Sequence, residues 1–191
     1  FAKSSGTTNA KSKFIPISKE ALEECHYKAG KDMLAIYCNN HPNTTIFDGK
    51  GLMLGGSQDN SLIKEYIDAD LSAILLDNFP FWIRMHRIPD LKTSLLSDWE
   101  EKLNKIIEQS KNENITSLTG ASSWMLILLN KVLEETNGKN ILDLWPNLEL
   151  YMHGGIDFQI YRKKFNKIIP TNNMNYLEVY NASEGFFAIQ D

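Results

Sequence analysis

The sequence predicts an α/β fold with a mostly parallel sheet that helices cover on both faces. Short apolar runs alternate with longer stretches whose apolar residues recur at helical spacing. This alternation favours parallel strands joined by crossover helices. The chain has 191 residues, 42% of them hydrophobic, and its composition does not shift along its length. We therefore expect one core, belonging to one domain or to part of one.

The first part of the chain predicts a long helix and a pair of strands. Ser18 follows an apolar lead-in and is the expected N-cap of a helix over 19–37, because a serine hydroxyl can accept a free N–H of the first turn. Residues 45–54 are expected to form two short strands around Asp48-Gly49, which is a common hairpin dipeptide. Gly55-Gly56 should end the second strand.

The second part alternates strands and helices more regularly. Ser122 or Ser123 is expected to cap a long helix whose apolar part covers 124–133, and Gly138 should end it. The other expected elements are an amphipathic helix over 98–109, strands over 115–118, 148–152 and 176–180, and a short helix over 161–165. In parallel sheets ligands bind at the carboxyl ends of the strands, so residues that follow these strands are the first candidates for a site.

A run of hydroxyl residues around one glycine lies near the start of the chain. The run Ser4-Ser5-Gly6-Thr7-Thr8 is followed by Lys11 and Lys13. Backbone N–H groups, hydroxyls and positive charge can together surround a polyphosphate, so the run is a candidate nucleotide loop. It does not match the G-x-x-x-x-G-K-[ST] phosphate loop. Taken alone, such a run is more often an ordinary solvated turn.

Two later segments support a nucleotide site. Tyr180-Asn181-Ala182-Ser183-Glu184-Gly185 offers an aromatic ring that can stack on a base and a carboxylate that can hold Mg²⁺. The alternating segment 144–153 leads into Gly154 and Gly155, as a strand would that presents flat backbone to a ligand. The alternative for the first segment is a strand that ends in a turn.

Together these three segments resemble the Gretchen Hagen auxin-responsive family of acyl acid-amido synthetases, in its bacterial form. The resemblance rests on SSGTT with KSKFIP, on WPNLELYMHGG and on YNASEGFFAIQD. The family belongs to the acyl-adenylate-forming superfamily. The resemblance implies that ATP and Mg²⁺ are used to convert a small-molecule carboxylic acid into an acyl-adenylate, from which an amino acid amine then displaces AMP.

The resemblance also implies roles for individual residues. Lys11 and Glu184 would be catalytic, the first as part of the charge around the phosphates and the second as the Mg²⁺ ligand. Residues Ser122, Ser123 and Trp124 would lie beside the acyl group, although relatives often carry proline where Ser122 stands. The nucleotide would be bound by Ser4, Ser5, Gly6, Thr7, Thr8, Gly154, Gly155, Tyr180, Ala182, Ser183 and Glu184.

The family's ribose-binding tyrosine-arginine-glycine-aspartate motif is not found, since Tyr161-Arg162 is followed by two lysines. Residues 1–191 are therefore expected to be the central part of the large nucleotide- and acyl-binding domain, without the small C-terminal domain, and to be inactive alone. Two alternatives stay open. One is an acyl-CoA ligase with the same adenylation step, and the other is a non-catalytic nucleotide-binding or scaffold relative.

Charge and composition limit the partners and the location. The net charge is −4 with both signs interspersed, which argues against a nucleic-acid partner. No signal peptide and no apolar run of about eighteen residues is found, so no membrane partner is expected. Cys25 and Cys38 do not form a disulfide framework, which favours the cytoplasm. The aromatic-rich segment 77–86 could wall an acyl pocket, but packing in a core is the favoured interpretation.

Overall fold

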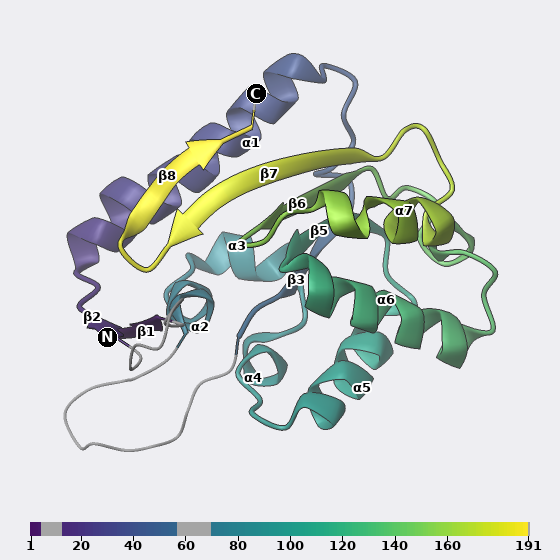
Figure 1. The fold of residues 1–191 in the computed structure, drawn as a ribbon, viewed down its shortest axis with the longest axis horizontal. Coiled ribbons are helices and arrows are strands. Elements are labelled where there is room, and N and C mark those ends of the chain that lie inside the picture. Colours follow the sequence, from purple (N-terminus) through teal and green to yellow (C-terminus); the bar gives the residue numbers. More distant parts are fainter. Residues whose placement is uncertain (5–12, 57–69, 191) are drawn as a thin grey trace.

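The computed structural model describes residues 1–4, 13–56 and 70–190, and a six-stranded sheet is its centre (Figure 1). The strand order is β4-β3-β5-β6-β7-β8, with every neighbouring pair parallel except the antiparallel pair β7 and β8. Its strands are β3 (Lys50–Leu54), β4 (Arg87–Ile88), β5 (Ile115–Gly120), β6 (Leu150–Gly154), β7 (Asn175–Ala182) and β8 (Gly185–Ile189). A separate antiparallel pair consists of β1 (Ala2–Ser4) and β2 (Lys13–Ile15).

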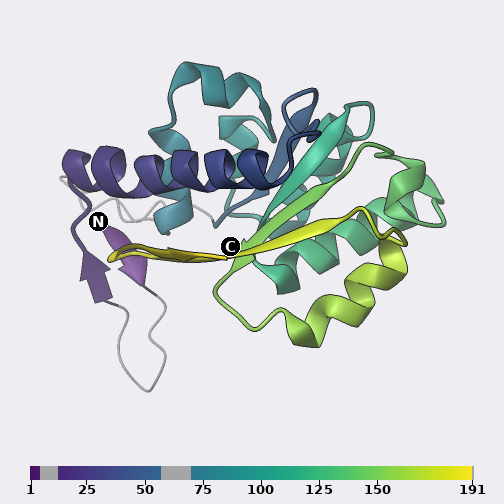
Figure 2. The ribbon, with the colours of Figure 1, turned by 90° about the horizontal axis from the view of Figure 1, so that it is seen from above.

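Helices cover both faces of the sheet, which confirms the predicted α/β class. Figure 2 shows α1 over one face and α6 and α7 against the other. The helices are η1 (Ala21–Tyr27), α1 (Lys28–Asn40), α2 (Leu71–Asp77), α3 (Phe81–Met85), α4 (Leu91–Ser94), α5 (Trp99–Ser110), α6 (Ser122–Thr136), η2 (Ile141–Asp143) and α7 (Gln159–Ile168). In the part of the chain that the structure describes, no helix has the length and apolar character needed to span a bilayer.

The core has two parts, one on each face of the sheet. The larger joins α5, α6 and α7 to the sheet and contains Leu118 and Tyr151. The smaller lies between α1 and the strands β6 and β7, where Met33 packs near Leu150 and Met152. Successive residues of β6 thus enter opposite clusters. Burial on both faces explains why Leu150, Tyr151 and Met152 follow one another without an exposed polar residue between them.

The long N-terminal helix begins as predicted but continues further. The backbone N–H of Ala21 donates to Ser18 Oγ at 3.1 Å, so Ser18 contributes to the cap as expected. Helical structure then runs to Asn40, and its section η1 is a π-helix. Such π-helical turns are rare and often occur at functional sites. The sequence predicted an ordinary helix over these residues.

The predicted strand over 45–48 is wrong. That segment is a turn and only β3 is a strand, because the carboxylate of Glu149 binds the segment in place of a neighbouring strand. Glu149 accepts hydrogen bonds from the backbone N–H and the hydroxyl of Thr45, both at 2.9 Å, and from the hydroxyl of Thr44. The hydroxyl of Tyr37 on α1 donates to the same carboxylate at 2.9 Å. A single acidic side chain therefore ties this turn to α1.

The predicted caps of α6 are also corrected. Ala121 is the N-cap residue and forms no side-chain cap, while Ser122 and Ser123 already belong to the helix. The helix ends at Thr136 and its C-cap residue is Asn137, which has a left-handed backbone with φ of 51°. The N–H of Gly138 bonds to Leu133 O at 3.2 Å. The left-handed position is thus one residue earlier than the predicted glycine stop, and asparagine tolerates it better than most residues.

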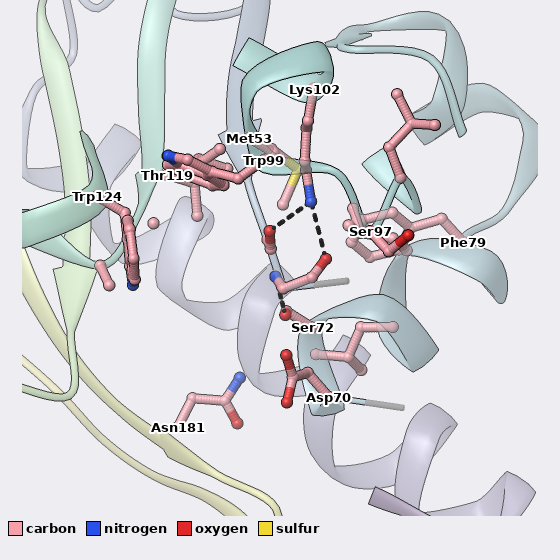
Figure 3. A pocket seen from close by; sticks show the side chains of 18 residues that line it. Met53, Asp70, Ser72, Phe79, Ser97, Trp99, Lys102, Thr119, Trp124 and Asn181 are labelled. Carbon is pink, nitrogen blue, oxygen red and sulfur yellow. Dashed lines mark hydrogen bonds between the residues drawn. The ribbon is translucent and has the colours of Figure 1, made fainter. Parts of the chain in front are cut away.

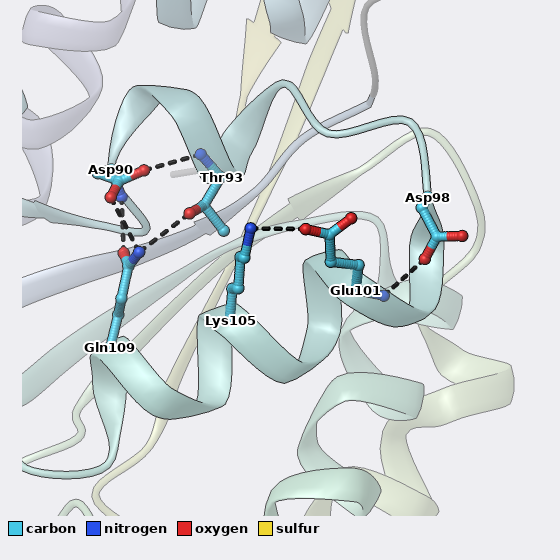
Figure 4. A network of polar contacts seen from close by, with 6 residues as sticks. All are labelled: Asp90, Thr93, Asp98, Glu101, Lys105 and Gln109. Atoms are coloured by element: carbon cyan, nitrogen blue, oxygen red, sulfur yellow. Dashed lines mark hydrogen bonds and ion pairs between the residues drawn. The ribbon is translucent and has the colours of Figure 1, made fainter.

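A polar network fixes α5 against α4 (Figure 4). Asp98 caps α5 by accepting the N–H of Glu101 at 2.7 Å. Asp90 caps α4 by accepting the N–H of Thr93 at 2.7 Å, and Gln109 of α5 donates to both Asp90 Oδ2 and Thr93 Oγ1 at 2.9 Å. The predicted amphipathic helix is confirmed. The network holds the last turn of α5 against α4, while the Asp98 cap is at the first turn, which carries the cavity residue Trp99.

Candidate functional site

A cavity of about 520 Å³ opens at the carboxyl ends of β3 and β5 (Figure 3). Residues 53–56 are the end of β3 and the two glycines after it, and residues 119–121 lead from the end of β5 into α6. These two strand ends form the floor of the cavity. The rest of the lining comes from α2, α5 and α6, from one residue of β7, and from the loop residues Asp70, Phe79, Leu96 and Ser97. The position agrees with the expectation that ligands bind at the carboxyl ends of parallel strands.

Aromatic side chains form one wall of the cavity. The rings of Trp99 and Trp124 meet edge to face with centroids 4.6 Å apart, and Trp124 is 50% exposed. Phe79 also lines the cavity, while Phe81 in the same aromatic-rich segment is 75% exposed. Phe79 also packs against the ring of Tyr27, with centroids 5.5 Å apart, so the favoured interpretation of that segment as core packing is wrong for Phe81 alone of these two phenylalanines. Flat rings at the mouth of a cavity suit an apolar or planar ligand.

Lys102 is a cavity residue that sequence reasoning missed. It is 2% exposed, and its ammonium donates to the carbonyl oxygens of Gly55 at 2.9 Å and Gly56 at 3.0 Å. Burial lowers the pKa of Lys102 to about 8, against the opposing effect of the Asp70 carboxylate. A signal was available, because Lys102 stands three residues after Trp99 and four before Ile106 on the apolar face of α5.

Asn181 joins the cavity to the π-helical turn. Its side chain lines the cavity, and its Oδ1 lies 3.0 Å from Nδ1 of His26, which is almost completely buried. Because an amide oxygen only accepts hydrogen bonds, Nδ1 of His26 carries the proton in this pair. Burial lowers the pKa of His26, while the bond to Asn181 opposes that shift. A neutral His26 thus orients the Asn181 amide, and Figure 3 shows that amide beside the cavity.

The other residues of the Tyr180–Gly185 segment lie on the hairpin of β7 and β8. Tyr180 is largely exposed and its ring packs 5.1 Å from that of Phe187. Ala182 and Ser183 are partly exposed and Glu184 is exposed in the turn. The predicted strand before this segment is confirmed. Asn181, for which the sequence assigned no role, is the member of the segment that reaches the cavity.

Glycine is required where β6 ends beside β7. A Cβ at Gly154 would lie 2.2 Å from the carbonyl oxygen of Val179, and Gly155 has a left-handed φ of 82°. The backbone of β6 can therefore approach its neighbour closely, as the sequence suggested for a flat surface. Neither glycine lines the cavity.

His153, just before Gly154, is a second buried titratable residue that the sequence did not single out. Its ring stacks on Phe158 with centroids 4.1 Å apart. Its Nδ1 has no hydrogen-bond partner among the residues that the structure describes. Burial lowers the pKa of His153 to about 4, and the positive charge of Arg162 acts in the same direction.

The remaining predicted site residues divide into buried, partly exposed and undescribed positions. Ser122 is fully buried, with its Oγ 3.4 Å from the Tyr151 hydroxyl, and Ser123 is partly buried. Neither lines the cavity, in contrast to Trp124. Ser4 ends β1. Ser5, Gly6, Thr7, Thr8 and Lys11 lie outside the described residues.

No cluster of three or more His, Cys, Asp or Glu side chains suited to a metal ion is found within residues 1–4, 13–56 and 70–190.

A comparison with protein families matches residues 1–174 to the GH3 family N-terminal domain. The matched region includes the cavity floor, α5, α6 and the glycines after β6, while Asn181 lies beyond it. A comparison with curated proteins found no match.

Proposed function

Because the chain belongs to the GH3 family, we propose that it contributes the nucleotide- and acyl-binding part of an ATP-dependent acyl acid-amido synthetase. In the first step a carboxylate oxygen attacks the α-phosphorus of ATP, and the bond to the leaving pyrophosphate breaks. In the second step an amino acid nitrogen attacks the acyl carbon, loses a proton and displaces AMP. The product is an N-acyl amino acid.

The observation that carries this proposal is the shared cavity of Trp124 and Asn181. The family resemblance implied that Trp124 lies beside the acyl group, and the segment containing Asn181 was interpreted as part of the nucleotide site. Their side chains come from α6 and β7, which are far apart in the sequence, and both line one cavity. An acid bound there would have its apolar body beside Trp99 and Trp124 and its carboxylate near the amide of Asn181.

The nucleotide would occupy the neighbouring edge of the sheet. Ser4 to Thr8 and Lys11 would surround the phosphates with hydroxyls, backbone N–H groups and positive charge. Tyr180 would stack on the base, and its exposure leaves the ring accessible. Gly154 and Gly155 would give the nucleotide and acyl group a close approach to the backbone, with Ala182 and Ser183 beside them.

Glu184 is the proposed Mg²⁺ ligand. Magnesium is commonly held by one or two carboxylates and by substrate phosphates, so a single exposed carboxylate in the β7–β8 turn fits this ion. When bound, Mg²⁺ neutralises phosphate charge during attack at the α-phosphorus. The lack of a multi-residue metal cluster in the described part of the chain is compatible with such a site.

The proposed first step needs positioning more than proton transfer. A carboxylate is already a nucleophile and pyrophosphate is a good leaving group, so orientation and charge neutralisation can supply most of the rate enhancement. His26 would act as a positioning residue, since its bond to Asn181 fixes the amide that faces the acid. Cytoplasmic location and the lack of nucleic-acid and membrane partners stay predictions from the sequence.

The test is acid-dependent exchange of labelled pyrophosphate into ATP by the full-length protein, over aromatic and aliphatic acids. Exchange with any acid supports adenylation. Products formed with amino acids or with coenzyme A then distinguish an amido synthetase from an acyl-CoA ligase. If no acid of the panel supports exchange while ATP still binds, the non-catalytic relative is favoured.

A further inference from the structure

The cavity contains a buried positive charge that the proposed reaction does not use. The ammonium of Lys102 has three N–H donors, and two of them bind the carbonyls of Gly55 and Gly56. Within the described ranges Lys102 forms no ion pair. Asp70, on the rim of the same cavity, is exposed to solvent. One donor of a buried cation is therefore left for a ligand.

An ammonium at this depth is costly to keep charged unless an acceptor compensates for the lost water. The two backbone carbonyls supply partial negative charge, and the Asp70 carboxylate favours the charged ammonium through space without forming an ion pair with it. An anionic group entering the cavity would gain a charge-assisted hydrogen bond with the third N–H. An apolar group in the same place would exclude water and leave that donor unpaired.

The arrangement of side chains indicates which end of a ligand would meet Lys102. In Figure 3, Lys102 enters the cavity from the α5 side and Asn181 from the opposite side, with Trp99 and Trp124 along one flank. An acid whose reacting carboxylate lies near Asn181 would place its far end toward Lys102. The volume of about 520 Å³ is suited to a small acid.

We propose that Lys102 selects acyl acids that carry a second carboxylate at the end remote from the reacting one. One carboxylate is activated near Asn181, and the other stays ionised and pairs with the Lys102 ammonium. The inference rests on the proposed function, because it names the substrate class of that same cavity. Dicarboxylic acids are therefore preferred over monocarboxylic acids of the same skeleton.

The experiment uses matched acids and measures pyrophosphate exchange by the full-length protein. Octanedioic acid is compared with octanoic acid, and para-carboxycinnamic acid with cinnamic acid. We expect the wild type to prefer the diacid of each pair. In Lys102→Met the diacid-to-monoacid ratio of kcat/KM should fall about ten- to a hundredfold, which corresponds to the loss of one hydrogen bond to a charged group.

Matched variants separate recognition from a structural role. Lys105→Met removes a lysine one turn on, whose ammonium pairs with Glu101 at 2.6 Å on the outer face, and it should keep the wild-type ratio. Lys102→Arg keeps the charge and should keep a diacid preference, whereas Lys102→Gln keeps a donor without the charge and should lose it. An equal loss for both acids in Lys102→Met and Lys102→Gln would mean that Lys102 only holds the Gly55–Gly56 turn, and would overturn the proposal.

A binding measurement makes the outcome independent of turnover. Octanedioic acid should raise the melting temperature of the wild type and of Lys105→Met, but not that of Lys102→Gln. If no acid supports exchange and this pattern still appears, the proposed reaction fails and the diacid site stands. If exchange occurs with monoacids and octanedioic acid gives no selective stabilisation, the reaction stands and the Lys102 inference fails.

Discussion

Trp145 and Trp124 lie in two regions of opposite character. Trp145 is 0% exposed in the core beneath the sheet, and its Nε1–H donates to Ser110 O at 3.1 Å. Trp124 is half exposed at the cavity, where its contact with Trp99 is made edge to face. The first ring is held by packing and by a hydrogen bond, whereas the second leaves part of its surface for a ligand.

The polar groups of the two regions differ less sharply, because the buried Tyr176 hydroxyl and Nε of Arg87, both outside the cavity lining, also have no hydrogen-bond partner among the described residues. In the core, the Thr116 hydroxyl donates to Ile46 O at 2.6 Å, so a buried polar group is satisfied internally. Around the carboxyl edge of the sheet, Lys102 is buried without an ion pair among the described residues and Nδ1 of His153 is unpartnered there. Departures from local packing rules are expected at functional sites, where they are kept for binding. The comparison predicts different effects of substitution in each region.

The largest effect on activity should come from Glu184→Ala, in the region around the carboxyl edge of the sheet. Loss of the proposed magnesium ligand should lower Mg²⁺-dependent pyrophosphate exchange in the full-length protein by about a hundredfold or more, as for other preorganised charge contacts. Stability should stay within about 0.5 kcal/mol, since the side chain is exposed. Glu178→Ala, an exposed glutamate on β7, is the control. Full activity with an unchanged metal requirement in Glu184→Ala would remove Glu184 from the site.

The two tryptophans give the next largest effect. Trp145→Ala should lower the free energy of unfolding by about 3–5 kcal/mol, because it empties a fully buried site. Trp124→Ala should cost much less stability but weaken acid binding, seen as a raised KM for the acid in exchange. Denaturant unfolding of both variants measures the difference. Equal destabilisation would mean that Trp124 belongs to the core and not to the cavity wall.

The sequence predicted the core better than the edge. Apolar periodicity correctly indicated α5, α6 and strands β5 to β7, because packing against a sheet leaves a regular pattern. It failed for the segment before β3, where the long-range acceptor Glu149 decides the local structure. The contact of the π-helical turn with Asn181 could not be predicted, because it joins residues distant in the sequence. The burial of Lys102 was indicated by its place on the apolar face of α5, whereas its partners Gly55 and Gly56, also distant in the sequence, were not.

The glycines that shape the edge give a smaller effect. Gly154→Ala should lower stability by about 1–3 kcal/mol, because its Cβ would meet the Val179 carbonyl at 2.2 Å and force β6 and β7 apart. The control is Gly30→Ala in α1, where a Cβ meets nothing within 4 Å. That change should stabilise the helix by about 0.5–1 kcal/mol. An unchanged stability in Gly154→Ala would show that β6 and β7 can move apart there without loss of stability.

His153 should have its effect only at acidic pH. With a pKa lowered by burial to about 4 in the folded protein, against an ordinary value of 6.5, it stays neutral when folded while the unfolded chain takes up a proton. The unfolded state therefore binds more protons between these values, so stability is full above pH of about 6.5 and falls as the pH drops toward about 4. His26 acts with the same sign, because its pKa is also lowered.

The contribution of His153 can be measured by comparing how steeply the free energy of unfolding changes with pH in two proteins. His153→Phe keeps a ring against Phe158 and removes the titration, so its unfolding free energy should fall less steeply than that of the wild type between pH 6.5 and 4. Denaturant unfolding over this range compares the two proteins, with the His26 contribution common to both. If the two plots of unfolding free energy against pH are parallel, solvent reaches His153 when it is protonated. The region around His153 would then be more accessible to water than the core.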